Sequence, residues 1–370
     1  MKIAIIGASG FVGLRLVERL HLTAKAEIVP IVHAYRSLAV LGRFTLPWRV
    51  VNPSDPAALS EALKGCDAVV HAALGDAGQI VTMAEALYPA AQAAGVKRIV
   101  ALSSAAVHTL TPASGTDEAT PIIASQKSEY NTAKAKAELL LENARRGGKT
   151  ELVQLRPSII YGPRSRLVAD IANQILSGTA YLVDDGSGIC NAVSVDNLID
   201  AIWLALTTPD ADRNTFLVND RDVVTWRHFY EAIAAGVGTN LDGVKAVQSP
   251  EFKESPSEKL ARIAATKTVQ ATLPFVPARM KRLAKAAAAA WTTPGPGRGW
   301  TLPEPAGPRV TEEMCQLQSC RWRFPITKAE RVLGYAPAHT FQEGMTRTAS
   351  WLVFVGIARP QRAGTAGRPA

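Results

Sequence analysis

Cysteine is scarce in this chain. Its 370 residues include only Cys66, Cys190, Cys315 and Cys320, too few and too scattered for the disulfide framework of a small secreted domain. The pair Cys315 and Cys320 lacks the second pair of ligands that a structural zinc site needs, so we expect no metal. Free thiols favour a reducing compartment, and we expect a cytoplasmic protein.

Long apolar runs are also absent. The run that follows Met1 ends at Gly7 and is too short for the core of a secretory signal peptide. Near the other end, residues 351–358 form an apolar stretch far shorter than the roughly 20 residues that cross a bilayer. We therefore expect neither an export signal nor a membrane-spanning helix, and we interpret residues 351–358 as a buried helix end.

The charge balance is positive but uneven. The formal net charge is +9 at pH 7, yet residues 241–300 alone hold 10 Lys and Arg against 4 Asp and Glu. Because the basicity is concentrated in one segment, the sequence favours no nucleic-acid partner. With 47% hydrophobic residues the chain can bury a full core, and its length exceeds that of one ordinary domain about twofold.

Short β-rich runs alternate with helical patterns over residues 1–163. Predicted strands are residues 2–6, 27–32, 48–51, 68–71, 98–102 and 152–155. Apolar residues at helical spacing lie between them, at 11–20, 56–63, 81–94 and 128–144. This alternation predicts an α/β fold in which a parallel sheet is covered by helices on both faces, a Rossmann-type doubly wound domain.

After residue 163 the alternation becomes irregular. Helical stretches are predicted at residues 167–175, 195–206 and 225–235, separated by Gly, Asp and Asn clusters. We expect residues 164–370 to form mainly a smaller substrate-binding lobe, with late strands of the sheet contributed from about 190–220. Residues 241–310 differ in composition and include a Pro/Gly-rich run at 292–308, so we interpret them as an exposed basic insertion.

Three glycines stand at the junction of the first strand and the first helix. Gly7 permits a tight turn, Gly10 lets the backbone approach a pyrophosphate, and Gly13 lets the helix pack closely on the sheet. Backbone amides near Phe11 and Val12 would then face the anion. The alternative is a glycine-rich turn without a ligand, but the position directly after the first strand favours dinucleotide binding.

The end of the second predicted strand bears on the choice between NAD and NADP. An acidic residue there would bind the free hydroxyls of an adenosine ribose, but no carboxylate lies between His33 and Ser37. Arg36 could instead pair with a 2′-phosphate through its forked donors, which favours NADP over NAD. The alternative is an ordinary solvated arginine.

Tyr130 and Lys134 are four residues apart in a predicted helix, so their side chains project from one face. A tyrosine has a pKa of about 10, and a nearby ammonium favours the phenolate that a general base needs. Upstream, Ser103 and Ser104 end the predicted fifth strand, at the edge where such sheets bind ligands. We expect Ser104, Tyr130 and Lys134 to be catalytic, with Ser104 donating a hydrogen bond to the substrate oxygen.

The glycine loop, Ser104, the Tyr130/Lys134 pair and the segment 155–163 (LRPSIIYGP) together resemble the extended short-chain dehydrogenase/reductase family, in its nucleotide-sugar epimerase/dehydratase branch. The resemblance extends into residues 191–196 and 333–337, and only about residues 241–320 fall outside it. It implies that Ala72 and Ala73 border the cofactor and that Pro157 lies beside the nicotinamide. It also implies a homodimer formed through the helix that carries Tyr130.

Two departures from the family pattern matter. Asn52 stands where an aspartate near the adenine is usual, although its amide carbonyl can still accept from adenine's amino group. Ala105 and Ala106 replace the Asp-Glu pair of 4,6-dehydratases, which argues against dehydration.

Three functions remain open from the sequence. The first is an oxidoreductase or epimerase that acts at a hydroxyl- or carbonyl-bearing carbon of a nucleotide sugar, with Tyr130 as acid/base. The second is a reductase or dehydrogenase of an apolar, steroid- or flavonoid-like alcohol or ketone, in which a basic amphipathic helix near Met280, Leu283 and Trp291 could touch a membrane surface, a contact we do not expect. The third is a non-catalytic NADP-binding scaffold or sensor.

Overall fold

The computed structural model describes residues 1–248 and 309–358. Seven parallel strands form the central sheet, in the order β10-β6-β5-β4-β1-β2-β3. Their bounds are β1 Lys2–Ile6, β2 Glu27–Val32, β3 Arg49–Val50, β4 Ala68–His71, β5 Arg98–Leu102, β6 Glu151–Pro157 and β10 Asn214–Val218. The strand order reverses between β1 and β4, which is where ligands of such sheets bind.

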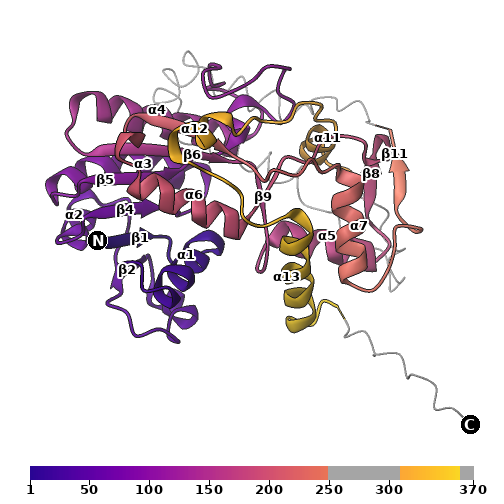
Figure 1. Ribbon diagram of the computed structural model, residues 1–370, viewed down its shortest axis with the longest axis horizontal. Helices are drawn as coiled ribbons and strands as arrows, with labels where there is room; N and C mark the ends of the chain where they lie inside the picture. The colour runs from indigo at the N-terminus through magenta and orange to yellow at the C-terminus, as the bar shows by residue number, and fades with distance from the viewer. Residues whose placement is uncertain (249–308, 359–370) are drawn as a thin grey trace, which may run out of the picture. The chain divides into compact units, whose positions relative to one another are not determined.

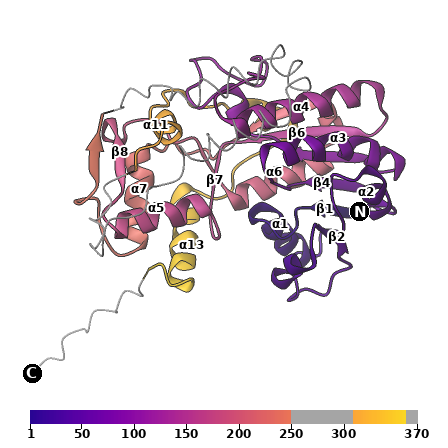
Figure 2. The same ribbon diagram turned by 180° about the vertical axis from the view of Figure 1, so that it is seen from behind.

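Side chains alternate between the two faces of each strand, so each face has its own core. Ile3 and Ile5 pack with α1 (Phe11–Leu22), α6 (Val195–Thr207) and α12 (Thr327–Leu333). Ala4 and Ile6 pack with α2 (Pro56–Leu63), α3 (Ala77–Ala93) and α4 (Glu129–Gly147). Figures 1 and 2, which view the molecule from opposite sides, show these helices packed against the sheet. The predicted Rossmann-type α/β fold is confirmed, and the predicted elements of residues 1–163 differ from the observed ones only at their ends.

A second core lies beyond the carboxyl end of the sheet. Two small parallel pairs of strands belong to it, β7 (Ile159–Tyr161) with β9 (Ala192–Ser194) and β8 (Tyr181–Val183) with β11 (Lys245–Val247). Around them pack α5 (Arg166–Leu176), α7 (Trp226–Gly236) and α13 (Phe341–Phe354), with fully buried Trp226, Tyr161 and Phe229 at the centre. Burying such large aromatic side chains supplies much of the stability of this lobe.

The segment that we expected to be an insertion begins as part of this lobe. Residues 245–247 pair with β8 as strand β11, so the lobe extends at least to residue 248. The remainder of the segment, including Met280, Leu283 and Trp291 and the Pro/Gly-rich run at 292–308, lies outside the described residues. The boundary at residue 163 between the two domains stays a prediction.

The apolar stretch at residues 351–358 is only partly the buried helix end that we expected. Leu352 and Ala358 are buried, but Phe354 is 86% exposed and Val355 is also exposed. The last turn of α13 presents one face to the core and the other to solvent, because a helix that packs on one side buries only about half of its residues. Within the described residues, no helix is both long enough and apolar enough to span a membrane.

The glycine loop is packed too tightly to accept a larger residue. Gly7 has a φ of +83°, and a Cβ there would lie 2.6 Å from the backbone nitrogen of Ala73. A Cβ on Gly13 would lie 2.2 Å from the carbonyl oxygen of Gly7. These contacts confirm the structural reasons that we inferred for glycine at both positions.

We expect Gly13→Ala to lower the free energy of unfolding by about 1–3 kcal/mol, because the added methyl group overlaps backbone that cannot yield easily. Gly147→Ala is the matched control: nothing lies within 4 Å of a Cβ there, and alanine is the better helix former, so stability should rise by up to about 1 kcal/mol. Urea unfolding of both variants measures the difference. Equal stabilities would contradict the close packing of the loop.

Candidate functional site

The first turn of α1 offers donors to an anion. Gly10 is the N-cap residue, has no side chain to cap the helix and is exposed. The amides of Phe11 and Val12 therefore begin a helix whose positive end faces away from the core. Ala72 and Ala73 follow β4 and contact Gly7 through their backbone, so they lie beside the same loop.

The two residues that we expected to contact the adenosine end of the dinucleotide are both exposed. Arg36 follows β2 in the short 3₁₀ helix Tyr35–Val40 and is exposed. Asn52 follows β3 and is also exposed, but its side-chain oxygen already accepts the backbone N–H of Ser54 at 3.1 Å. A carbonyl oxygen has a second lone pair, so Asn52 keeps one acceptor for adenine.

The three expected catalytic residues come together at the carboxyl edge of the sheet. Ser104 follows β5, and Tyr130 and Lys134 lie in the first two turns of α4. A hydrogen bond joins the side chains of Ser104 and Tyr130, and the Lys134 ammonium lies 6.0 Å from the centre of the Tyr130 ring. Pro157 ends β6 at the same edge.

Ser104 keeps its proton available. Its oxygen accepts the backbone N–H of Ala106 at 3.2 Å. Because that contact uses a lone pair and not the hydroxyl hydrogen, Ser104 can donate to Tyr130 or to a substrate oxygen.

The pKa of Tyr130 differs from our expectation. Burial of its hydroxyl raises the pKa of Tyr130, the hydrogen bond from Ser104 lowers it, and the negative charge of Glu313 raises it further. The net effect is a pKa above the usual value, whereas we expected Lys134 to lower it. The reason is the distance: the ammonium is not hydrogen-bonded to the phenol but donates to the carbonyl oxygen of Leu102 at 2.9 Å.

Lys134 is almost completely buried, and burial lowers its pKa to about 8, while the negative charge of Glu138 opposes that shift. An ammonium with so low a pKa changes its protonation near physiological pH. Among residues 1–248 and 309–358 the ammonium has one hydrogen bond, to Leu102, which leaves further donors for a ligand.

A buried network of ion pairs and hydrogen bonds lies near the three expected catalytic residues. Arg156 forms an ion pair with Glu138 at 2.5 Å and contacts the His108 ring at 2.7 Å, and Glu138 also accepts from Ser103. Burial, followed by the charge of Arg156, lowers the pKa of His108 to about 4, so this ring is neutral. The network joins β6 and α4 to the segment that follows β5, and so links the helix of Tyr130 and Lys134 to the segment of Ser104.

A cavity of about 20 Å³ lies next to Lys134 and is lined by His71, Gln154 and Glu138 among others. Within the part of the chain that the structure describes, the Nε2 atom of His71 and the side-chain oxygen of Gln154 are buried without a hydrogen-bond partner. Burial, with a smaller contribution from Lys134, lowers the pKa of His71 to about 3. The cavity has room for one water molecule, which would satisfy these atoms.

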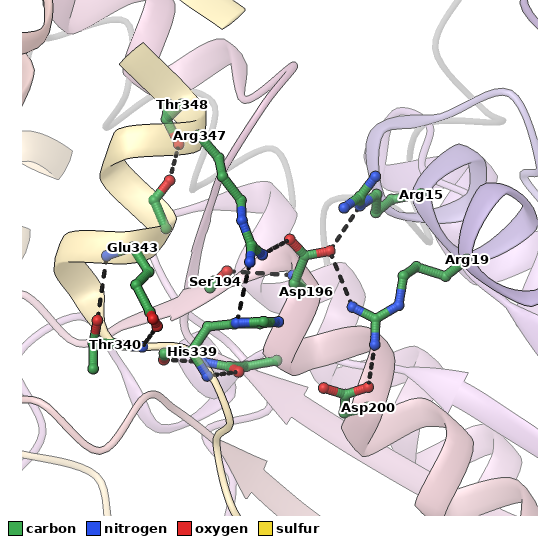
Figure 3. Close-up of polar contacts among 12 residues, drawn as sticks. Arg15, Arg19, Ser194, Asp196, Asp200, His339, Thr340, Glu343, Arg347 and Thr348 are labelled. Atoms are coloured by element: carbon green, nitrogen blue, oxygen red, sulfur yellow. Dashed lines mark hydrogen bonds and ion pairs between the residues drawn. The ribbon is translucent and has the colours of Figure 1, made fainter. Parts of the chain in front are cut away.

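Asp196 is a structural residue of the site that the sequence reasoning missed. It is 1% exposed, and Arg15 at 2.7 Å, Arg19 at 3.5 Å and Arg347 at 2.8 Å form ion pairs with it. In Figure 3, the two arginines of α1 approach the carboxylate from one side and Arg347 of α13 from the other. Asp196 therefore fixes the helix that follows the glycine loop to the C-terminal helix. Three arginines spread over more than 300 residues gave no local pattern that could have revealed this.

Other kinds of site find no support in the described residues. No group of three or more His, Cys, Asp or Glu side chains lies where it could hold a metal ion. Cys66, Cys190, Cys315 and Cys320 are all free and buried, so none of them forms a disulfide.

The sequence matches one family over more than half of its length. A model of the NAD dependent epimerase/dehydratase family matches residues 3–219. These residues include the glycine loop, the Ser104–Tyr130–Lys134 group and Asp196.

Among curated proteins, a 3beta-hydroxysteroid-dehydrogenase/decarboxylase of Arabidopsis thaliana (isoform 2) is 26% identical over 273 residues, covering 69% of this chain and 41% of the relative. A UDP-glucose 4-epimerase of Mycolicibacterium smegmatis is 30% identical over 174 residues, covering 45% of this chain and 52% of that protein. The chain thus spans about half the length of these relatives.

Solved structures resemble the chain along nearly its whole length. A UDP-glucose 4-epimerase of Thermotoga maritima, solved with UDP-glucose, has a TM-score of 0.67 at 18% identity and covers 96% of this chain and 99% of its own. A dTDP-glucose 4,6-dehydratase of Streptomyces venezuelae, solved with NAD, has a TM-score of 0.67 at 19% identity. The match covers 95% of this chain and 97% of that one. At these identities the likeness shows a shared fold.

We expect Asp196→Asn to lower the free energy of unfolding by about 1–3 kcal/mol at neutral pH. This is less than the loss for a fully buried pair, because the side chains of Arg15, Arg19 and Arg347 are 29%, 29% and 42% exposed. Burial raises the pKa of Asp196, but the arginines outweigh it and hold the pKa below the ordinary 3.8. The stabilisation is therefore present above that value and is lost as the pH falls through the lower pKa of the folded state.

Urea unfolding at neutral and acidic pH tests this, with Asp200→Asn as the control. Asp200 forms one ion pair, with Arg19 at 2.7 Å, and is partly exposed, so its loss should cost less than about 1 kcal/mol. Equal losses in the two variants, or a loss at Asp196 that does not shrink in acid, would contradict the role of Asp196.

Proposed function

We propose that this chain, which belongs to the NAD dependent epimerase/dehydratase family, is an NAD(P)-dependent enzyme that acts at a hydroxyl-bearing carbon of a nucleotide sugar, with epimerisation as the net result. The observation that carries the proposal is the meeting of Ser104, Tyr130 and Lys134 at the sheet edge that also holds the glycine loop. The similarity to UDP-glucose 4-epimerases supports the choice of substrate class.

The residues present fit a dinucleotide. The uncapped first turn of α1 would hold the pyrophosphate, and the spare donors of the Lys134 ammonium would bind ribose hydroxyls. A dinucleotide held there would supply hydride transfer to and from the substrate carbon. The exposed Tyr130, which is 38% accessible, leaves its ring open to a ligand on one side.

Tyr130 and Ser104 divide the proton chemistry. Once deprotonated to the phenolate, Tyr130 would take the proton of the substrate hydroxyl during oxidation and give it back during reduction. Ser104 donates a hydrogen bond to the same oxygen and so stabilises both the alcohol and the carbonyl form of the substrate. A substrate that rotates between the two steps presents its opposite face, and the product is then the epimer with no net redox change.

The choice of dinucleotide depends on one side chain. Arg36 is exposed directly after β2, where its guanidinium could bind a 2′-phosphate, which supports NADP. Related structures were solved with NAD, and Asn52 retains an acceptor for the adenine of either dinucleotide. We therefore propose NADP as the preferred cofactor and NAD as the alternative.

A second substrate class has a specific observation in its favour. The hydroxysteroid dehydrogenase/decarboxylase of Arabidopsis thaliana matches a longer part of this chain than the UDP-glucose 4-epimerase of Mycolicibacterium smegmatis does. The same Ser-Tyr-Lys chemistry would oxidise an apolar secondary alcohol. Turnover of a sterol alcohol, with no turnover of UDP- or dTDP-hexoses, would favour this alternative over the sugar.

The remaining expectations stay proposals. We propose a cytoplasmic homodimer that pairs through the helix carrying Tyr130, with no nucleic-acid partner. The presence of all three catalytic side chains argues against a non-catalytic scaffold or sensor.

Tyr130→Phe should reduce epimerisation of a UDP-hexose by about 10²–10⁴-fold, because the variant lacks the group that moves the proton. Its affinity for the dinucleotide, measured by fluorescence titration, should not change. Tyr230→Phe is the matched control, since the buried hydroxyl of Tyr230 has no hydrogen-bond partner in the described part of the chain. Wild-type turnover by the Tyr130→Phe protein would show that another residue is the acid/base.

Arg36→Ala should weaken NADPH binding by about 10–100-fold, the effect of losing hydrogen bonds to a charged phosphate, and should leave NADH binding unchanged. Arg43→Ala provides the control, because Arg43 is exposed in the same loop but pairs with Glu18. The measurement is the ratio of the two dissociation constants by fluorescence titration. Equal weakening of both cofactors would contradict a 2′-phosphate contact.

A further inference from the structure

Two contacts join the end of strand β5 to helix α4 through the expected catalytic residues. Ser104 and Tyr130 share a hydrogen bond between their side chains. The Lys134 ammonium donates to the backbone carbonyl oxygen of Leu102 at 2.9 Å. Ser104 stands on the segment that leaves the sheet, whereas Tyr130 lies in the first turn of α4. The distance between them therefore depends on how the helix is placed against the end of the strand.

A third contact lies between these two along the strand and uses residues with no part in the proposed chemistry. The hydroxyl of Ser103 donates a hydrogen bond to the carboxylate of Glu138. Glu138 follows Lys134 by four residues, as Lys134 follows Tyr130, so all three side chains lie on one face of α4. The consecutive residues 102–104 are therefore each bound to a different turn of the same helix face.

Both partners of this third contact are buried. Ser103 is 8% exposed and Glu138 is 3% exposed. Together with Lys134 they line the cavity of about 20 Å³. A hydroxyl that donates to a charged carboxylate makes a hydrogen bond about twice as strong as one between neutral groups. The contact is therefore strong for a single hydrogen bond.

The neighbouring strand β6 holds both partners. The backbone N–H of Ser103 donates to the carbonyl oxygen of Leu155 at 2.8 Å, which continues the ladder between β5 and β6 by one residue. Arg156, the next residue of β6, donates from its Nε atom to both oxygens of Glu138, at 3.0 and 3.2 Å. Ser103 and Glu138 are thus fixed relative to the same strand, and the hydrogen bond between them fixes the position of α4 along the sheet.

We propose that Ser103 and Glu138 are positioning residues. Their hydrogen bond holds α4 at the place along β5 where Tyr130 reaches the substrate oxygen to which Ser104 donates. Catalytic groups must be held within about 0.5 Å of the productive geometry, and a displacement of about 1 Å can lower a rate by roughly 100-fold. The catalytic consequence rests on the proposed function, whereas the placement of the helix does not.

Ser103→Ala is the variant that tests this role. It removes the hydroxyl and leaves the buried ion pair intact, whereas a change at Glu138 would leave Arg156 buried without its partner and endanger the fold. Thr150→Val is the matched control, because it also removes one buried hydroxyl. That hydroxyl donates to the carbonyl oxygen of Val96 at 3.0 Å, at the opposite end of the sheet.

The first readout needs no substrate and uses urea unfolding. Tyr130→Phe removes the hydrogen bond with Ser104 and should lower the free energy of unfolding. In the Ser103→Ala background this loss should be smaller, because the helix no longer holds Tyr130 at bonding distance. In the Thr150→Val background the loss should keep its wild-type size. Equal losses in all three backgrounds would overturn the positioning role of Ser103.

The second readout is turnover of a UDP-hexose, expressed per dinucleotide-binding site counted by fluorescence titration. Ser103→Ala should lower kcat by about 10–100-fold and keep KM within about twofold of the wild-type value, since the substrate still binds while the reacting groups are displaced. Thr150→Val should keep the wild-type kcat. An equal fall in kcat in both variants, or a higher KM with an unchanged kcat, would overturn the catalytic consequence. Unequal losses in urea, with no turnover of any sugar by the wild type, would support the placement of α4 and overturn the proposed function.

Discussion

Asp196 is the charge on which the arrangement of the site depends. A carboxylate that is 1% exposed is costly to bury unless partners compensate it. Its partners come from α1, through Arg15 and Arg19, and from α13, through Arg347. The helix that begins at the glycine loop is thereby held to a helix more than 300 residues later in the chain. Together with the contact of Gly7 on Ala73, this fixes the place where the pyrophosphate would bind.

A second buried ion pair, between Arg156 and Glu138, holds the catalytic edge in a comparable way. Lys134 lies beside a small cavity and donates a hydrogen bond to the carbonyl oxygen of Leu102, not to Tyr130. Burial raises the pKa of the Tyr130 phenol in this state, the hydrogen bond from Ser104 lowers it, and the charge of Glu313 raises it further. A bound ligand that draws the Lys134 ammonium away from Leu102 would change the electrostatic environment of Tyr130, which couples cofactor binding to proton transfer.

The sequence predicted the fold of residues 1–163 well because each element there has a local signal. Short β-rich runs predicted the strands, helical spacing predicted α1 to α4, and the glycines marked the loop. It also predicted that Ser104, Tyr130 and Lys134 would meet, because a parallel sheet brings its carboxyl ends to one edge. The roles of Asp196 and Glu138 were not predictable, since each depends on partners distant in sequence. The pKa of Tyr130 was predicted in the wrong direction, because burial cannot be read from the spacing of two residues.

The most direct measurement follows the hydrogen at the reacting carbon. The protein is incubated with dinucleotide and UDP-glucose that carries deuterium at C4, and the product is analysed by NMR and mass spectrometry. If the Ser104–Tyr130–Lys134 group supports hydride transfer and return, UDP-galactose will form with the deuterium retained at C4. Product that carries solvent hydrogen at C4, or a complete absence of product, would contradict it.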